Sequence, residues 1–361
     1  MHYTIVSTYP AQGSRNVGDA LISTATAEFV LQHDPEATFE NIWRAAPRED
    51  ARKVIDSSEH VIFACLAIRG SMTKVYSFIE DVVISGKPFS IVAAGTALDM
   101  SKSKLVQQDF TERDREIIAN AGLRAKVFST RGVLTQAFLK SNGIRQSEYC
   151  GDVAFGTSGK AFHKKSDVKK ILVSDPHYAG RYLRAFEELV TGLMNTFPDA
   201  EIACARHGVN GRIEDKCAEL GVRVLPLYES VNALRLAYDE CDLHVGFRVH
   251  GHVTALNHGK PSYLLEQDGR GADYRLSLNL RVSTPCFLAT SATVSTRNML
   301  STLLGRSPLP RDPLPSAVAL ILSLVEDHAQ HDFEIFEKMT PILEDIRERN
   351  HALFARICSR P

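Results

Sequence analysis

The sequence predicts an α/β protein with two parallel-sheet domains that face each other across a cleft, braced by helices at the C-terminal end. Three observations favour this fold class. Short apolar runs alternate with segments of helical period along most of the chain. This rhythm pauses at a small, polar and basic stretch over residues 156–167 and then restarts. The length of 361 residues also suits two domains of ordinary size.

The first predicted domain spans residues 1–160. Strands are expected over residues 3–8, 38–43, 60–68, 89–94 and 126–129. Helices are expected between them over residues 19–32, 72–85, 111–121 and 132–141. Strands that alternate with helices at this spacing form parallel βαβ units.

The second predicted domain spans residues 161–310 and repeats the pattern. Its strands are expected over residues 170–174, 200–205, 222–225, 243–247 and 261–265. Its helices are expected over residues 181–196, 213–220 and 231–241, and from about residue 251 onward.

The last predicted segment, residues 311–361, follows a proline-rich linker over residues 307–315 and forms two helices. An apolar stripe runs from Phe333 to Phe354. A helix with such a stripe must bury one face, so it is expected to pack across the domains.

The composition is that of a soluble globular protein, with 44% hydrophobic and 24% charged residues. The formal net charge of −1 gives no electrostatic reason to expect a nucleic-acid or anionic-membrane partner. The seven cysteines include no CxxC pair, so they are expected to be reduced and structural. The amino terminus lacks the features of a signal peptide, and the apolar runs are too short to span a bilayer. A cytoplasmic location is expected.

The stretch 242–259, DLHVGFRVHGHVTALNHG, carries the strongest functional signal. It passes from a buried strand into a helix, with Arg248 and His250 at the junction, which is where open α/β sheets bind ligands. The helix terminus suits an anion, and the fork of Arg248 matches a carboxylate or a phosphate. His250 can exchange a proton near neutral pH. Together, Arg248 and His250 predict a catalytic site that binds an anion. The alternative is that Arg248 is a surface cation with an ordinary partner and that His250 caps the helix.

Three further histidines, His244, His252 and His258, lie in the same stretch. Their spacings match no ordinary zinc-ligand pattern. We therefore expect structural histidines and no metal site.

Other strand-to-helix junctions also carry polar residues. Asn16, Gly18 and Asp19 form the sequence NVGD before the first helix, where Asp19 could equally be the helix cap. Gly18 allows a tight turn that would let a ligand approach, but the loop does not match GxGxxG. Arg131 follows another strand, with a surface salt bridge as its alternative role. Asp152 is expected to make a structural hydrogen bond.

Together, the NxGD loop, the SxR junction, the GD-A-F turn and the GFRVHGHVTAL–GKP segment occur in an order that resembles the polysaccharide pyruvyltransferase family. The resemblance covers the chain from about Asn16 to Pro261. Members of this family transfer the pyruvyl group of phosphoenolpyruvate onto sugar hydroxyls as a ketal. The resemblance implies two Rossmann-like domains of glycosyltransferase-B type, with the active site in the cleft between them.

The resemblance also implies roles for individual residues. It suggests that Asp19 and His250 are the catalytic acid–base pair, although which is the acid stays open. It assigns substrate binding to Asn16, Gly18, Arg131 and Arg248. The implied donor substrate is phosphoenolpyruvate, without cofactor or metal. The implied acceptor is a sugar or lipid-linked oligosaccharide that enters an exopolysaccharide or a cell-surface glycan.

Two loops depart from the usual family pattern. A glycine-rich loop is replaced by CLAIRGSM around Arg69, and a glutamine-containing turn is replaced by AAGTALDM around Ala94. Both are expected on the acceptor side of the cleft. Two other functions therefore stay open: a nucleotide-sugar glycosyltransferase whose arginines bind a diphosphate, and a catalytically silent protein that binds glycans or anions. The sequence makes no prediction of the oligomeric state.

Overall fold

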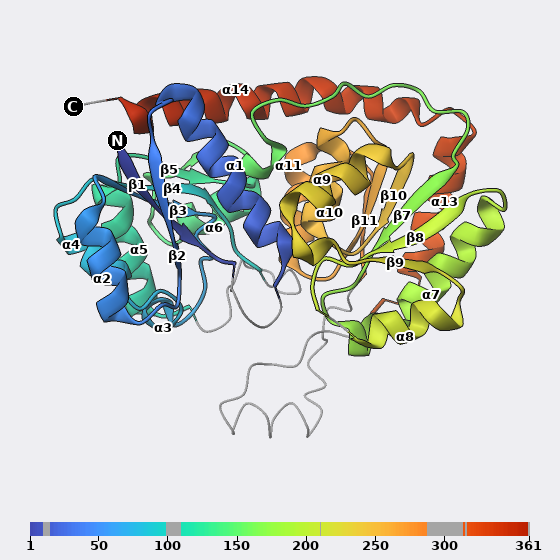
Figure 1. Cartoon of the computed structure of the whole chain (residues 1–361), viewed down its shortest axis with the longest axis horizontal. Coiled ribbons are helices and arrows are strands. Elements are labelled where there is room, and N and C mark those ends of the chain that lie inside the picture. Colours follow the sequence, from blue (N-terminus) through green and yellow to red (C-terminus); the bar gives the residue numbers. More distant parts are fainter. Residues whose placement is uncertain (10–14, 99–109, 210, 287–312, 315, 360–361) are drawn as a thin grey trace.

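The computed structural model describes residues 1–9, 15–98, 110–209, 211–286, 313–314 and 316–359, which form two separate six-stranded sheets (Figure 1). The predicted α/β fold class, with two parallel sheets, is confirmed. The first sheet has the strand order β2-β1-β3-β4-β5-β6, with every neighbouring pair parallel. Its strands are β1 (His2–Ser7), β2 (Thr38–Trp43), β3 (His60–Ala64), β4 (Phe89–Ala94), β5 (Phe128–Thr130) and β6 (Glu148–Tyr149).

Helices cover both faces of this sheet, and β3 and β4 are buried along their whole length. Such double coverage explains why these strands read as continuous apolar runs. The helices are α1 (Val17–His33), α2 (Arg48–Ser57), α3 (Met72–Val75), α4 (Ile79–Ile84), α5 (Glu112–Arg124) and α6 (Val133–Ser141), followed by the 3₁₀ turn η1 (Val153–Phe155).

The second sheet has the order β12-β11-β10-β7-β8-β9 and is also parallel throughout. Its strands are β7 (Lys170–Ser174), β8 (Glu201–Ala205), β9 (Arg223–Leu225), β10 (Leu243–Gly246), β11 (Ser262–Glu266) and β12 (Ser283–Pro285). Its helical segments are α7 (Ala179–Thr196), α8 (Gly211–Glu219), η2 (Leu227–Glu229), α9 (Val231–Glu240), α10 (Val249–Asn257) and α11 (Gly269–Leu278).

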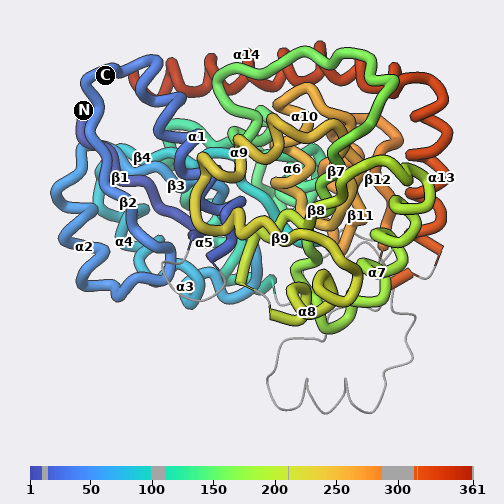
Figure 2. The backbone as a smooth tube through the Cα atoms, turned by 45° about the vertical axis from the view of Figure 1, so that its right-hand side comes forward, coloured from blue at the N-terminus to red at the C-terminus, as the bar shows by residue number. Residues whose placement is uncertain are grey.

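The C-terminal segment contains α13 (Ala317–Ala329), η3 (Glu334–Lys338) and α14 (Met339–Cys358). Both views show α14 running along one side of the molecule over both sheets (Figures 1 and 2). Near its C-terminal end, Phe354 stacks on Phe29 of α1, with ring centroids 4.9 Å apart. Nearer its start, Arg347 Nη2 donates to Asn257 Oδ1 of α10 at 2.8 Å. The terminal helix therefore ties the two domains together.

Two expectations about elements need correction. The single helix predicted over residues 72–85 is wrong, because the chain forms α3 and α4 with a break at Tyr76. The hydroxyl of Tyr76 accepts a hydrogen bond from the backbone N–H of Ala67 at 2.8 Å, which anchors this break. The apolar stripe predicted on one helix is also divided, since Phe333 and Phe336 precede α14.

Several elements were not predicted at all: β6, β12, α2 and α11. The two strands have only two and three residues and lie at sheet edges, so they are too short for a periodic signal. The linker predicted over residues 307–315 lies outside the described residues, apart from 313–314. Among the helices in the described part of the chain, none has the length and apolar character needed to cross a membrane.

Candidate active site

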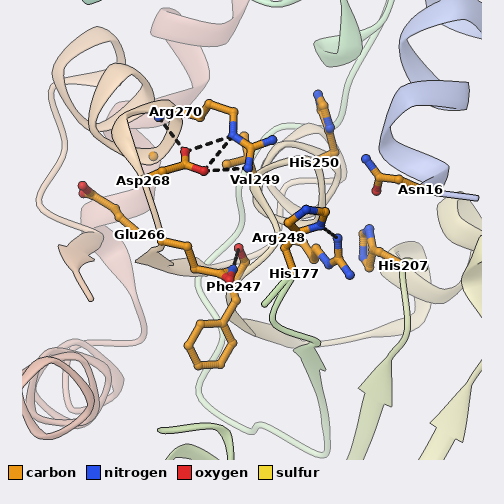
Figure 3. Close-up of a pocket in the computed structure, with 12 residues that line it drawn as sticks. Asn16, His177, His207, Phe247, Arg248, Val249, His250, Glu266, Asp268 and Arg270 are labelled. Carbon is orange, nitrogen blue, oxygen red and sulfur yellow. Dashed lines mark hydrogen bonds and ion pairs between the residues drawn. The ribbon is translucent and has the colours of Figure 1, made fainter. Parts of the chain in front are cut away.

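A pocket opens at the carboxyl ends of the strands of the second sheet, where the start of α1 meets this edge (Figure 3). Its cavity volume is about 40 Å³, and it is partly open to solvent. Asn16 lines it from the first domain, and all the other described residues that line it come from the second. They include His177, His207, Arg248, His250, Asp268 and Arg270. Asp19 and Arg131 are not among the described residues that line it.

Chain topology explains this gathering of polar residues. Parallel strands place all their carboxyl ends on one edge, so the segments after β7, β8, β10 and β11 meet there. The first domain joins through α1, whose Val17 N–H donates to the carbonyl of His207 at 3.0 Å. This bond satisfies one free N–H at the start of α1 and fixes the helix on the edge of the other domain.

The guanidinium of Arg248 is paired within its own domain. Its Nε lies 2.9 Å from Asp175 Oδ1 and its Nη2 lies 2.6 Å from Oδ2, while Nη1 lies 3.2 Å from His177 Nδ1. Asp175 is fully buried and Arg248 is nearly so. The fork predicted to bind a ligand anion is therefore mostly occupied by a protein carboxylate.

His177 supports this arrangement as a neutral ring. Burial lowers its pKa to about 4, and the charges of Arg248 and Arg270 act in the same direction. At neutral pH one ring nitrogen can therefore accept the Nη1–H of Arg248.

The ring of His250 extends away from the guanidinium of Arg248 (Figure 3). Arg248 is the extended N-cap of α10 (φ −92°, ψ 118°), whereas His250 lies in the first turn of this helix, so the two side chains leave the backbone in different directions. The ring packs on the first domain: a Cβ added at Gly18 would lie 2.3 Å from His250 Nδ1. Gly18 is thus needed for the approach of this ring, whereas the sequence suggested the approach of a ligand.

On its other side, His250 faces Asp152. Its Nε2 lies 3.7 Å from Asp152 Oδ2 and is buried without a hydrogen-bond partner among the described residues. Asp152 is fully buried; its Oδ1 accepts from the N–H of Ala154 at 2.8 Å, and its Oδ2 accepts from the hydroxyl of Tyr274. Burial alone would raise the pKa of Asp152, but His250, Arg131 and Tyr274 lower it to about 2.

The sequence predicted only a structural hydrogen bond for Asp152, and the bond to Ala154 is one. It missed the pairing with His250. Asp152 comes three residues after β6, at the same carboxyl edge as the other candidates. Because β6 has only two residues, that position could not be recognised from the sequence.

Arg131 lies between the domains and is 7% exposed. Its Nη1 is 3.5 Å from Cys65 Sγ, and its guanidinium lies 5.7 Å from the ring centroid of Tyr274 in α11. Its Nε has no hydrogen-bond partner among the residues that the structure describes. The alternative of a surface salt bridge is therefore wrong, and Arg131 does not reach the pocket that Arg248 lines.

Asp19 lies in the first turn of α1 and is half-buried; the N-cap is Asn16, so the cap reading of Asp19 is wrong. Its charge suits the positive end of the helix dipole. Burial raises the pKa of Cys65 to about 11, Arg131 opposes this, and Asp152 and Asp19 add to it. The charges of Asp19, Arg131 and Asp152 thus all act on one thiol.

Both loops that depart from the family pattern also touch Arg131. Cys65 has φ 57°, a left-handed conformation that glycine adopts without strain. A Cβ added at Gly95 would lie 2.4 Å from Arg131 Nε. The expected effect of these departures on the acceptor side stays a prediction; in the structure the two loops shape the surroundings of Arg131.

Asp175, His177, Asp268 and Arg270 were not singled out in the sequence. They follow β7 and β11, so the strand-end rule that selected Arg248 would have found them too. Arg270 Nη2 lies 2.6 Å from Asp268 Oδ2, and both residues line the pocket (Figure 3).

Two other histidines of the stretch 242–259, His244 and His252, have structural contacts. His244 lies 2.7 Å from Ser262 Oγ and 2.9 Å from Ser174 Oγ, and His252 lies 2.7 Å from Ser262 Oγ. Within the described residues, no group of three His, Cys, Asp or Glu side chains is arranged to hold a metal ion.

Comparison with known proteins gives one family match. The family model for polysaccharide pyruvyl transferase matches residues 16–269. No curated protein matches the chain significantly.

Solved structures with a similar fold include three whose descriptions name UDP or UDP-N-acetylglucosamine. A protein described as a UDP-N-acetylglucosamine 2-epimerase from Listeria monocytogenes has a TM-score of 0.56 at 14% identity, covering 94% of this chain and 90% of that chain. The UDP-GlcNAc 2-epimerase of Neisseria meningitidis, bound to UDP-GlcNAc, has 0.53 at 11%, covering 94% and 93%. MnaA of S. aureus with UDP has 0.51 at 12%, covering 94% and 90%. At such identities the likeness shows a shared two-domain glycosyltransferase-B fold.

Proposed function

This chain belongs to the polysaccharide pyruvyl transferase family, and from that premise we propose that it moves the pyruvyl group of phosphoenolpyruvate onto two hydroxyls of a sugar. The observation that carries the proposal is the contact of His250 with Gly18, one residue from Asp19. This contact brings His250 of the second domain against the first turn of α1 in the first domain, which carries the carboxylate of Asp19. Arg248 and Arg270 line the pocket beside His250.

The donor carries a carboxylate and a phosphate, and the pocket supplies cationic groups for both. Arg270, which is paired with Asp268, lines it beside Arg248, whose Nη1 contacts the neutral ring of His177 and not Asp175. Charge-assisted hydrogen bonds of this kind are among the strongest polar contacts in proteins. Arg131 is buried beyond the pocket and would act on the donor through its field.

The proposed reaction adds two sugar hydroxyls to one carbon of the donor. A proton is added to the methylene carbon of the donor, which becomes a methyl group, while one sugar hydroxyl bonds to the adjacent carbon and gives up its own proton. The bond from that carbon to the phosphate oxygen then breaks, and the second hydroxyl takes its place. The proton of the second hydroxyl leaves with the phosphate, so the products are a ketal and inorganic phosphate.

We assign His250 as the acid that protonates the methylene carbon and Asp19 as the base that accepts the hydroxyl proton. An imidazolium gives up a proton near neutral pH, and a carboxylate can accept a proton from an attacking hydroxyl. Each such group contributes about 100- to 10,000-fold to the rate.

Phosphate release tests the donor. The protein is incubated with phosphoenolpyruvate and a panel of sugars and lipid-linked oligosaccharides, and in parallel with nucleotide sugars. Acceptor-dependent phosphate release from phosphoenolpyruvate supports the proposal. Release of a nucleoside diphosphate without turnover of phosphoenolpyruvate would overturn it in favour of a glycosyltransferase. Glycan binding without any turnover would overturn it in favour of a silent binding protein.

The role of His250 is tested by His250→Gln. Turnover should fall about 100-fold or more, because the acid is lost, while calorimetric affinity for phosphoenolpyruvate stays within about threefold. The matched control is His258→Gln at the other end of α10, where the ring contacts Asp239 at 3.2 Å. That variant should keep wild-type turnover. Equal loss of donor affinity and turnover in His250→Gln would make His250 a binding residue.

A further inference from the structure

The Nε2 atom of His250 is a buried polar atom without a hydrogen-bond partner among the described residues. Leaving such an atom unpaired costs about 1–3 kcal/mol, so its surroundings need an explanation. The carboxylate of Asp152 faces it at 3.7 Å. This separation is longer than a hydrogen bond, but contacts of catalytic groups are often long before substrate binds, and a small ring rotation would close it.

Asp152 is held by groups other than His250. Ala154 N–H and the hydroxyl of Tyr274 bond to its two oxygens, and the side chain is fully buried. A carboxylate with both oxygens bonded keeps one orientation. The oxygen that faces His250 is therefore in place before the ring turns toward it.

The other nitrogen of the ring, Nδ1, faces the first turn of α1. It is the ring atom that comes closest to a Cβ built at Gly18, and Asp19 follows in the same turn. The two nitrogens thus have different surroundings: Nε2 faces a buried carboxylate, and Nδ1 faces the first turn of α1, which carries Asp19, the base proposed for the sugar hydroxyl.

The other ionisable groups around α10 do not compete with Asp152. Those nearest its first turns include Asp19 of α1, Tyr238 of α9, His244 of β10, Glu266 of β11, and His207, whose ring lies beside Gly251. Burial lowers the pKa of His207 and of His244 and raises that of Tyr238, so these three stay neutral near pH 7. Glu266 is bonded to Arg275 at 2.7 Å.

We infer that Asp152 is the positioning residue of the proton donor: it holds Nε2–H of His250 and stabilises the imidazolium, so that Nδ1 delivers the proton to the donor carbon. A buried carboxylate behind a histidine is known to fix its tautomer and support its charged form. The inference rests on the proposed function. It adds that the acid is assembled from both domains, since Asp152 belongs to the first, and His250 and Tyr274 to the second.

The test uses the full chain with Asp152→Asn and Asp273→Asn. Both carboxylates act on Arg131, but only Asp152 faces His250; Asp273 instead accepts from Leu134 N and Thr135 Oγ1 at the start of α6. In Asp152→Asn, kcat should fall at least about tenfold with KM for phosphoenolpyruvate within about twofold. The alkaline limb of its kcat–pH profile should move down by roughly one unit or more, because an opposite charge is lost. In Asp273→Asn this limb should stay in place.

The inference would be overturned if the alkaline limb of the kcat–pH profile did not move in Asp152→Asn, or if it moved equally in Asp273→Asn. Tyr274→Phe gives a second measurement that keeps the carboxylate: losing the hydroxyl should lower kcat by about two- to tenfold without moving the KM. Unfolding curves confirm that each variant is folded before its kinetics are compared.

A spectroscopic measurement separates this inference from the proposed function. In protein labelled with ¹⁵N-histidine, the His250 Nε2–H held by a carboxylate should give a downfield, slowly exchanging resonance. It is identified by its loss in His250→Gln, and it should disappear in Asp152→Asn and remain in Asp273→Asn. Failure of phosphate release with this resonance pattern intact would reject pyruvyl transfer but keep the positioning. A resonance unchanged in Asp152→Asn would reject the positioning.

Discussion

Arg248 and Arg131 both follow strands of parallel sheets, but the fold uses them in different ways. Arg248 sits inside the second domain with two nitrogens on the carboxylate of Asp175, at 2.9 and 2.6 Å. Arg131 sits between the domains, over the ring of Tyr274, with its Nε unpaired among the described residues. Arg248 forms a buried ion pair with Asp175, whereas Arg131 is a buried cation whose charge lowers the pKa of Asp152.

This difference shows what a strand-end position determines. The topology brings a residue to the functional edge of its sheet, but the partner of its side chain depends on tertiary contacts. The partner of Arg248 follows a neighbouring strand of the same sheet, and the partners of Arg131 come from both domains. Arg248 is therefore expected to matter for stability as well as for binding, and Arg131 mainly for the electrostatics of Asp152.

The largest expected effect on the free energy of unfolding comes from breaking the ion pair between Arg248 and Asp175. Arg248→Met leaves the buried carboxylate of Asp175 without its cation, and breaking a buried pair typically costs about 3–5 kcal/mol. Urea unfolding should show a loss of that size. Donor affinity should fall as well, but only in protein that is still folded under the assay conditions.

Arg131→Met is the matched variant for this comparison. Among the described residues Arg131 bonds to no carboxylate directly, so this substitution breaks no bonded ion pair and should cost less than Arg248→Met. Its free energy of unfolding should therefore change by less than about 1.5 kcal/mol. Similar losses in the two variants would show that both arginines are paired alike, and the distinction between them would fail.

The next effect is the pH dependence of stability at Asp152. Its pKa is lowered to about 2, so it stabilises the fold above the usual carboxyl pKa near 4, by about 2 kcal/mol, and this contribution is lost as the pH falls toward 2. The difference in melting temperature between wild type and Asp152→Asn should thus be widest above pH 5 and narrow below pH 4.

The pH dependence of stability at Asp273 should have the opposite sign to that at Asp152. Burial raises its pKa, so its contribution to stability falls as the pH rises through the folded value. The difference between wild type and Asp273→Asn should move in favour of the variant with rising pH. Parallel trends in the two variants would mean that the cluster around Arg131 does not distinguish these carboxylates.

Much of the fold could be predicted from the sequence, because buried parallel strands and amphipathic helices leave periodic signals. The candidates His250 and Asp19 were found by their positions at strand ends. What failed depends on tertiary structure: the pairing of Arg248 with Asp175, the role of Gly18 as space for His250, and the contact of Asp152 with that ring. Each joins segments about 70 residues or more apart in the chain, and local pattern carries no record of such contacts.

The smallest expected effect concerns an ion pair on the outside of the domain junction. Arg235 of α9 binds Glu28 of α1 through two parallel contacts of 2.6 and 2.7 Å, with about a third of each side chain exposed. It links the same two domains as the buried contact of Val17 with His207. Because solvent screens it, Glu28→Gln should lower the free energy of unfolding by less than about 1 kcal/mol. The loss should shrink as salt rises from about 0.05 to about 0.5 M, since the screening length falls below about 10 Å.

Turnover of Glu28→Gln should stay near the wild-type value, because the buried contacts of α1 keep Gly18 against His250. A loss of about 3 kcal/mol, or a fall in turnover as large as that in His250→Gln, would show that the exposed pair sets the domain arrangement. The junction would then depend on the outer contact, and the buried cluster of Asp152, His250 and Arg131 would follow from it.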